Sequence, residues 1–158
     1  MPHPPEPFQA FRFLVEVENS GVVSAAFSQF SGVQMEVQTI QARIGSDPRG
    51  VQTGIPVGTS FAPVTLTRGV VGDNDFLEWL YAAAAGPHAG PTGDSLRRTI
   101  NVVALDQRGR RGVVWSLRGA MPIRYELAPM DGSRSEVLSE SITFAINGME
   151  RRTEPAEG

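Results

Sequence analysis

The sequence predicts a mainly β protein, a barrel or sandwich of about eight antiparallel strands flanked by one α-helix. Two patterns and the chain length support this. Apolar and polar residues alternate with period two over much of the chain, as in half-buried strands. Only one segment, near residue 80, has the helical period. The length of 158 residues suits a single domain, residues 1–158, with an ordinary core. A sheet of that size either exposes its edges or closes into a barrel.

Four strands are predicted in the first half of the chain. The first, over residues 11–18, carries on one face Phe11, Phe13, Val15 and Val17. Turn residues 19–21 lead into a second strand over residues 22–30, so the two form a hairpin. The third strand follows Ser31-Gly32, and its face pattern slips at Thr39-Ile40, which indicates a β-bulge. The fourth runs from about Ala62 to Arg68.

The segment between the third and fourth strands has no periodicity. Residues 43–58 include Gly45, Pro48, Gly50, Gly54, Pro56 and Gly58. This composition predicts a long loop, over about residues 43–60, and a loop of that length in a compact domain is usually functional or disordered.

One helix is predicted after the fourth strand. Asp73 or Asp75 can cap it, and Asp75 with Glu78 has the spacing of a capping box. Gly86-Pro87 ends it. Its broad apolar stripe consists of Phe76, Leu77, Leu80, Tyr81 and Ala84. Trp79 widens the apolar surface, so we expect the helix to be covered on more than one side.

Four further strands are predicted in the second half. A fifth strand over residues 97–105 turns at residues 106–109 into a sixth with Val113, Trp115 and Leu117 on one face. Pro122 opens a seventh, and the eighth spans residues 138–147. A Pro-rich arm over residues 1–10 and a polar tail over residues 150–158 are expected to be loosely held. The expected core and helix-packing residues are Phe13, Val15, Leu66, Phe76, Trp79, Leu80, Trp115, Ile142 and Phe144.

Composition excludes several classes of protein. There is no cysteine, which excludes a disulfide framework and a thiolate metal site. The net charge of −3 gives no basic stripe for duplex nucleic acid. All 14 basic residues are arginine. The sequence shows no apolar run of the roughly 20 residues that cross a bilayer, and no signal peptide at its start. We therefore expect a cytoplasmic product that does not insert into membranes.

Candidate sites of chemistry are weak. His3 and His88 have no second ligand at a metal spacing. His88 lies near Asp94 and Ser95, but a nucleophilic set is recognised by geometry, and a polar surface loop explains these residues more simply. The glycine-rich residues 86–93 lack the lysine of a phosphate loop and precede a strand.

Charged clusters have simple structural explanations as well. The basic residues Arg108, Arg110 and Arg111 sit at a predicted hairpin turn, where solvated charge is the usual explanation. Asp73 and Asp75 suit the positive end of the helix dipole better than a catalytic pair. The sequence therefore predicts no enzyme, no metal and no cofactor.

Three collinear stretches resemble the phage tail-tube family, which also supplies the tubes of extracellular contractile injection systems and shares its fold group with the haemolysin-coregulated protein of type VI secretion. The first is Phe11–Glu18 followed by Phe27-Ser28-Gln29-Phe30-Ser31-Gly32-Val33. The second is Val64-Thr65-Leu66-Thr67-Arg68-Gly69-Val70 leading to Leu77-Glu78-Trp79-Leu80. The third runs from Arg97-Arg98 through Asp106-Gln107-Arg108-Gly109, Trp115 and Ala120-Met121-Pro122-Ile123 to Asn147-Gly148-Met149. Together they cover about residues 8–150.

The sequence departs from the family pattern in the long segment. Where many members have Tyr-Arg-Glu-Gly-Gly and Lys-Leu-Pro-Gly, this chain has Ala42-Arg43-Ile44-Gly45-Ser46 and Thr53-Gly54-Ile55-Pro56-Val57-Gly58. Met121 replaces the tryptophan before Pro122. These differences leave two roles open, the major tube subunit and a baseplate-proximal initiator or adaptor.

The resemblance implies a structural subunit that forms hexameric rings, stacked into a hollow conduit for cargo delivery. It implies as partners other copies of the chain, a surrounding sheath, baseplate, spike and tube-terminating proteins, and an effector protein or DNA in the lumen. Assembly would occur in the cytoplasm, in a phage tail or a particle that is later released. A small β-barrel enzyme or ligand-binding module is the alternative from another class.

The long loop is our candidate for reaching the next ring. Its expected contact residues are Arg43, Ile44, Asp47, Arg49, Val51, Ile55, Pro56, Val57 and Phe61. Burial against a neighbour would order a segment that its prolines and glycines leave loose in a monomer.

Overall fold

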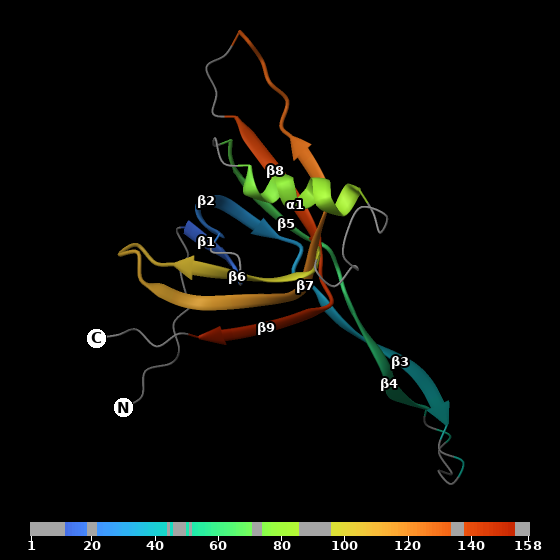
Figure 1. Cartoon of the computed structure of the whole chain (residues 1–158). Helices are drawn as coiled ribbons and strands as arrows, with labels where there is room; N and C mark the ends of the chain where they lie inside the picture. The colour runs from blue at the N-terminus through green and yellow to red at the C-terminus, as the bar shows by residue number, and fades with distance from the viewer. Residues whose placement is uncertain are drawn as a thin grey trace, which may run out of the picture.

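The computed structural model describes residues 12–18, 22–43, 45, 50, 52–70, 74–85, 96–133 and 138–153. Nine strands and one helix lie in these residues (Figure 1). In chain order they are β1 Arg12–Val17, β2 Val22–Ser31, β3 Met35–Arg43, β4 Gln52–Phe61, β5 Val64–Gly69, α1 Asp75–Ala84, β6 Arg98–Leu105, β7 Arg111–Leu127, β8 Ser139–Ala145 and β9 Gly148–Thr153. The mainly β prediction with one helix is confirmed.

Seven strands form one sheet that closes on itself. Their order is β6-β1-β2-β5-β8-β7-β9, and β6 also pairs with β7. Each of these strands is antiparallel to its partners. The predicted β1–β2 hairpin is present, with Phe13 opposite Phe27. The sheet can close because the long strand β7 pairs with strands in two different parts of it. Its first half pairs with β6 and β9, and its second half pairs with β8.

The predicted sixth and seventh strands are a single bent strand, β7, which corrects the sequence prediction. The bend lies at Gly119, whose φ is +62°. The segment that pairs with β7 bends at the same level, between β8 and β9. There the Asn147 N–H donates to the Arg118 carbonyl at 3.0 Å. Pro122 is tolerated inside β7 because that half of the strand pairs on one side only.

Gly119→Ala is expected to lower the free energy of unfolding. The left-handed backbone alone costs about 1–2 kcal/mol for a residue with a Cβ, and the Asn147 carboxamide already fills the space that a Cβ would take. Urea unfolding measures the loss. Gly132→Ala is the control, since a Cβ at Gly132 would meet nothing within 4 Å. Equal effects of the two variants would contradict this account of the bend.

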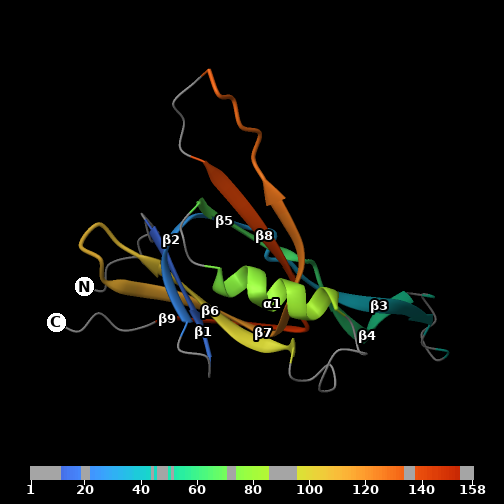
Figure 2. The same ribbon diagram turned by 45° about the horizontal axis from the view of Figure 1, so that its top comes forward.

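The predicted long loop is largely a β-hairpin, which is a second correction. Strands β3 and β4 pair from Met35 opposite Phe61 to Arg43 opposite Gln52, as a separate two-stranded sheet. Figures 1 and 2 show this hairpin projecting away from the main sheet. The glycines and prolines of this segment hide the period of a strand. Pairing with β3 still satisfies the backbone hydrogen bonds of β4. The pairing register shifts between Gln38 and Thr39, where a bulge in the third strand was predicted, but the extra residue is Val57 of β4, and β3 itself alternates without a break.

Helix α1 packs against β7 of the main sheet, and β5 and β8 lie beside it (Figure 2). The predicted capping box is absent: Asp75 is the first helical residue, and the N-cap Asn74 makes no side-chain capping hydrogen bond. Asp73 and Gly86-Pro87 lie outside the described residues. Phe76 and Trp79 are buried, and their rings contact Phe144 at centroid distances of 6.1 and 5.5 Å.

The core lies between the two halves of the sheet and α1. Of the expected core residues, six are buried: Val15, Leu66, Phe76, Trp79, Ile142 and Phe144. Phe13 and Trp115 are partly buried and pack against this core. Leu80 is only partly buried.

The expected polar tail begins as a strand. Glu150 to Thr153 belong to β9 and pair with β7, with Trp115 opposite Arg151. The Pro-rich arm over residues 1–10 and residues 154–158 lie outside the described part of the chain.

Candidate subunit interfaces

The β3–β4 hairpin exposes an unusual amount of apolar surface. Every residue from Gln34 to Gln41 and from Gln52 to Thr59 is exposed. Five of them have large apolar side chains with 44–56% of their surface accessible: Met35, Val37, Ile40, Ile55 and Val57. A two-stranded hairpin on its own is at best marginally stable in water. Exposed apolar surface of this extent marks an interaction site.

Apolar side chains lie on both faces of the hairpin. Directly opposite residues share a face, so Met35 lies with Phe61 and Ile40 with Ile55. Odd and even positions of β3 alternate, so Met35 and Val37 lie on the face opposite Ile40. The shift at Thr39 leaves Val57 without a directly paired partner in β3. A hairpin that is apolar on both faces cannot be covered by laying it on one surface.

The structure locates only some of the contact residues expected from sequence. Arg43, Ile55, Pro56 and Val57 are exposed on the hairpin. Phe61 is at its base, partly buried against the core, which makes it an anchor of the hairpin. Ile44, Asp47, Arg49 and Val51 lie outside the described residues.

A second candidate interface is formed by strand edges in the main sheet. The strands β2, β5, β8 and β7 follow one another in the sheet. Among the described residues, the segment Gln29–Ser31 of β2 pairs with β5 and has no partner on its other edge. Likewise the second half of β7, Met121–Leu127, pairs only with β8. As far as the structure describes the chain, this four-stranded part of the sheet therefore has two edges without a neighbouring strand, and such edges are templates for pairing with another chain.

The open edge of β7 is also apolar. All residues from Ile123 to Leu127 are exposed. Ile123, Tyr125 and Leu127 have 36–48% of their surface accessible, and Met130 just beyond them has 62%. Period-two alternation identified these residues as a strand, but alternation does not show which strand lacks a neighbour.

A buried ion pair lies next to this edge and is hydrogen-bonded to Tyr125 of β7. The Arg68 guanidinium donates to Glu140 Oε1 at 3.0 Å, with both side chains almost fully buried. The guanidinium carbon also lies 5.2 Å from the Phe27 ring centre and 5.4 Å from that of Phe76. The second carboxylate oxygen, Oε2, accepts a hydrogen bond from the Tyr125 hydroxyl at 2.9 Å. The network thus joins β5, β8, β7 and the helix.

The Tyr125 hydroxyl should make stability fall at alkaline pH. Its hydrogen bond to Glu140, followed by burial and the negative charge of that carboxylate, raises the pKa of Tyr125. A raised pKa favours the neutral phenol in the folded state. This contribution is complete below the pKa of an unfolded tyrosine, about 10, and is lost as the pH rises through the higher folded value.

Tyr125→Phe should therefore remove part of the alkaline fall in stability, measured by urea unfolding at about pH 8 and about pH 11. Tyr81→Phe is the control, because it leaves the Tyr125–Glu140 hydrogen bond intact and removes only the smaller effect of the Tyr81 charge on the pKa of Tyr125. An unchanged alkaline fall in Tyr125→Phe would contradict the assignment.

The two outward faces of the sheet differ in chemistry. On the β5–β8 side, hydroxyl groups pair across the strands: Thr65 with Thr143 at 3.0 Å and Thr67 with Ser141 at 2.9 Å. On the β1–β6–β7–β9 side, charged and neutral polar side chains form a network in which Asn101 and Ser116 are buried; its bonds are Arg111–Glu16 at 2.7 Å, Asn101–Glu18 at 3.2 Å, Ser116–Asn101 at 2.7 Å, Arg152–Ser116 at 2.9 Å and Arg118–Glu150 at 2.6 Å.

The described residues contain no group of three or more histidine, cysteine or acidic side chains placed to hold a metal ion. His3, His88, Asp94 and Ser95 lie outside them. Arg108 and Arg110 are exposed at the β6–β7 turn, and Arg111 is partly exposed. The backbone N–H groups of Arg110 and Arg108 hydrogen-bond to Asp106 and lower the pKa of its carboxyl. Within the described residues, no helix is long and apolar enough to span a membrane.

Several solved structures share this fold. The tube-terminating cap of the anti-feeding prophage has 21% sequence identity and a TM-score of 0.74, with 98% of this chain and 96% of that chain covered. The sheath–tube complex of an extracellular contractile injection system, PVC, in its extended state has a chain with 19% identity and a TM-score of 0.72, with 94% and 93% covered. The six-fold symmetrised anti-feeding prophage baseplate has one with 16% identity and a TM-score of 0.67, with 95% and 97% covered.

Identity this low shows a common fold. The comparison with curated proteins gave no significant match. The sequence model of one family, T4-like virus tail tube protein gp19, matches residues 9–150. That range includes the helix, both candidate interfaces and all of the strands except the end of β9. This chain therefore belongs to the T4-like virus tail tube protein gp19 family, whose members are structural tube subunits.

Proposed function

We propose that six copies of this chain form a ring, and that the rings stack into the hollow inner tube of a contractile injection particle. Family membership supports the tube, and the six-fold symmetrised relative supports six copies. The observation that carries the proposal is the combination of two open sheet edges with a projecting hairpin that is apolar on both faces.

The open edges suit a head-to-tail ring. Four antiparallel strands lie in the order β2-β5-β8-β7, so β2 and β7 run in opposite directions. When a copy is rotated about a ring axis, its β7 edge meets the β2 edge of its neighbour in antiparallel orientation. Pairing there continues the sheet and fills both edges, and a closed ring leaves none unpaired.

The hairpin suits contact between rings. Its base is anchored by Phe61 in the core, while its apolar residues lie beyond the body of the subunit. Since both faces carry apolar side chains, insertion between copies of an adjacent ring would bury Val37 on one side and Ile40 on the other. The described contact residues expected from sequence, Arg43 and Ile55 to Val57, belong to this same surface.

The hydroxyl face of the ring sheet would line the lumen. The other face of these strands is buried under α1 and the rest of the body, and a ring has more room for that bulk on its outside. Arg124 lies opposite Thr143, and Glu126 lies opposite Ser141. Arg124 and Glu126 form an ion pair at 3.1 Å. A lumen of hydroxyls and paired charges would let cargo, an effector protein or DNA, pass without strong binding.

The remaining partners follow from this arrangement. The charged face of β1, β6, β7 and β9 is our candidate for the surface that meets the sheath. Baseplate, spike and tube-terminating proteins would cover the ends of the stack. Assembly would take place in the cytoplasm, and the finished particle could be released. The role is mechanical and needs no catalytic group.

Electron microscopy of the purified protein and of the particle tests the proposal. We expect rings with six subunits that stack into a tube. A chain that remains monomeric at high concentration, with and without tube-forming partners, would contradict it.

A second candidate role is suggested by the similarity to a tube-terminating cap. A terminating or baseplate-proximal adaptor would be present in one or a few rings per particle, whereas a major subunit fills the tube. Counting copies per particle separates the two roles.

A further inference from the structure

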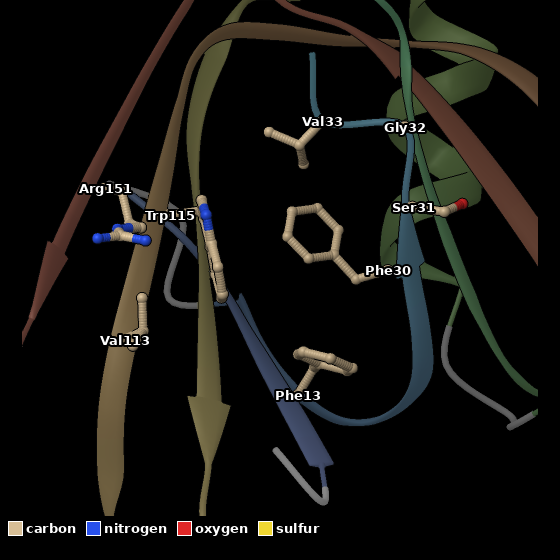
Figure 3. Close-up of a pocket in the computed structure, with 8 residues that line it drawn as sticks. All are labelled: Phe13, Phe30, Ser31, Gly32, Val33, Val113, Trp115 and Arg151. Atoms are coloured by element: carbon tan, nitrogen blue, oxygen red, sulfur yellow. The ribbon is translucent and has the colours of Figure 1, made fainter. Parts of the chain in front are cut away.

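An aromatic pocket borders the open edge of β2. Its volume is about 440 Å³. Figure 3 shows that its walls come from β1, β2 and the link to β3 on one side and from β7 and β9 on the other. The side chains that define it are Phe13, Phe30, Val33, Val113, Trp115 and Arg151. Phe30 belongs to the segment Gln29–Ser31, whose outer edge has no partner among the described residues, so the pocket lies beside that edge.

The aromatic lining is only partly covered in the single subunit. The Phe30 ring lies 6.0 Å from that of Phe13 and 5.6 Å from that of Trp115, both edge to face. All three side chains retain some exposure to solvent. Further apolar side chains placed here would therefore bury aromatic surface and gain the usual stabilisation of such contacts.

The pairing register places Phe30 and Tyr125 in one row of the sheet. Phe30 lies opposite Leu66, which lies opposite Ile142. Ile142 in turn lies opposite Tyr125. Residues in one row share a face of the sheet, so Tyr125 is on the core-facing side, as Phe30 is. Leu127 follows two residues later in β7 and faces the same side.

The open edge of β7 thus presents apolar side chains on the same face as the pocket. Tyr125 and Leu127 have 36% and 41% of their surface accessible. The hydrogen bond from the Tyr125 hydroxyl to Glu140 at 2.9 Å holds the Tyr125 ring in place. In a head-to-tail ring, the β7 edge of one copy meets the β2 edge of the next. A continuous sheet keeps its two faces, because a slip of one residue would turn every side chain to the wrong side.

We propose that Tyr125 and Leu127 of one copy close the aromatic pocket of the next copy in the ring, where they pack against Phe30 and Trp115. This inference rests on the proposed ring. It adds which side chains of the partner bind and where they bind, and it makes the pocket complete only in the assembly.

Fluorescence quenching during ring assembly tests the proposal. The chain has two tryptophans. Trp79 is 4% exposed and donates to the Leu96 carbonyl at 2.6 Å, so acrylamide should reach only Trp115. We expect Trp115 to become protected over the concentration range in which sedimentation shows that rings form.

The two possible failures are distinguishable. Rings in which Trp115 stays as accessible as in the monomer would overturn the inference and leave the proposed ring intact. If no rings form at any concentration, the proposed function fails, and this inference fails with it.

A matched pair of variants separates the pocket contact from pairing of the backbone. Leu127→Ala should weaken ring association roughly three- to eightfold, because it removes a partly exposed leucine from the interface. The rings that still form should leave Trp115 more accessible. Glu126→Ala is the control, because Glu126 lies on the same edge but faces the other side, opposite Ser141. Equal effects of the two variants would contradict the packing of Leu127 in the pocket.

Disulfide trapping locates the contact. The chain has no cysteine, so Val33→Cys with Leu127→Cys introduces a unique pair. Within one subunit β5 and β8 separate β2 from β7. Three strand spacings of about 4.8 Å exceed the Cα separation of about 7 Å that a disulfide can bridge, so the bond has to join two chains.

Mild oxidation of assembled rings should therefore give a ladder of covalent oligomers that ends at the closed ring. Val33→Cys with Glu126→Cys is the control, because position 126 faces the opposite side of the sheet. Crosslinking of the 33–127 pair no faster than that of the 33–126 pair would overturn the inference.

Discussion

Arg68→Ala is expected to lower the free energy of unfolding by about 3–5 kcal/mol, because it leaves the Glu140 carboxylate buried without its cation. Arg68 is 1% exposed and Glu140 is 4% exposed, so water cannot replace the lost partner. The cation–π contacts of Arg68 with Phe27 and Phe76 are lost as well. Denaturant unfolding measures the change.

Arg124→Ala is the matched control for the buried pair. Arg124 and Glu126 are joined at 3.1 Å, but both side chains are more than 60% exposed. An exposed pair of this kind contributes about 0–1 kcal/mol. If Arg68→Ala and Arg124→Ala lower the free energy of unfolding equally, burial would not explain the contribution of the Arg68–Glu140 pair to stability.

A double variant distinguishes the effect of leaving one buried charge unpaired from the effect of removing both buried charges. Arg68→Met with Glu140→Leu removes both buried charges and should recover much of the stability lost in Arg68→Ala. It also removes the acceptor of the Tyr125 hydroxyl. We therefore expect stable subunits whose β7 edge is less firmly held, seen as faster amide hydrogen exchange at residues 123–127.

Val37→Asp combined with Ile40→Asp should abolish stacking of the rings while leaving the subunit folded. Both side chains are about half exposed, 51% and 54%, on opposite faces of the hairpin. Their replacement changes little within the subunit, about ±0.5 kcal/mol as for other surface sites. In a stacked tube each aspartate would be buried without a cation, which is strongly unfavourable.

Sedimentation and electron microscopy measure this effect. We expect single rings or monomers in place of tubes, with an unchanged far-ultraviolet circular dichroism spectrum. Gln107→Asp with Thr153→Asp is the control, because it adds the same charge at exposed positions outside the hairpin. Tubes of normal length in the Val37 and Ile40 variant would exclude the hairpin as the inter-ring contact.

Several sequence predictions were wrong for identifiable reasons. Strand β4 was predicted as a loop because its two glycines and one proline obscure alternation, yet its pairing with β3 fixes it as a strand. Residues 150–153 were predicted as a tail because Glu150, Arg151 and Arg152 are polar on both faces. They form a strand because β7 offers them an edge. Gly119 bends β7 where an interruption was predicted.

The sequence by itself determined the fold class, the helix, the position of the register shift near Thr39 and the resemblance to tail-tube proteins. These properties depend on period, turn chemistry and the order of short motifs, all of which are local. Only the tertiary structure decided which edges stay open, that the long segment is a hairpin with two apolar faces, and that Arg68, Glu140 and Tyr125 form one network. Those features depend on which distant strands pair, and a strand's own residues do not specify its neighbour.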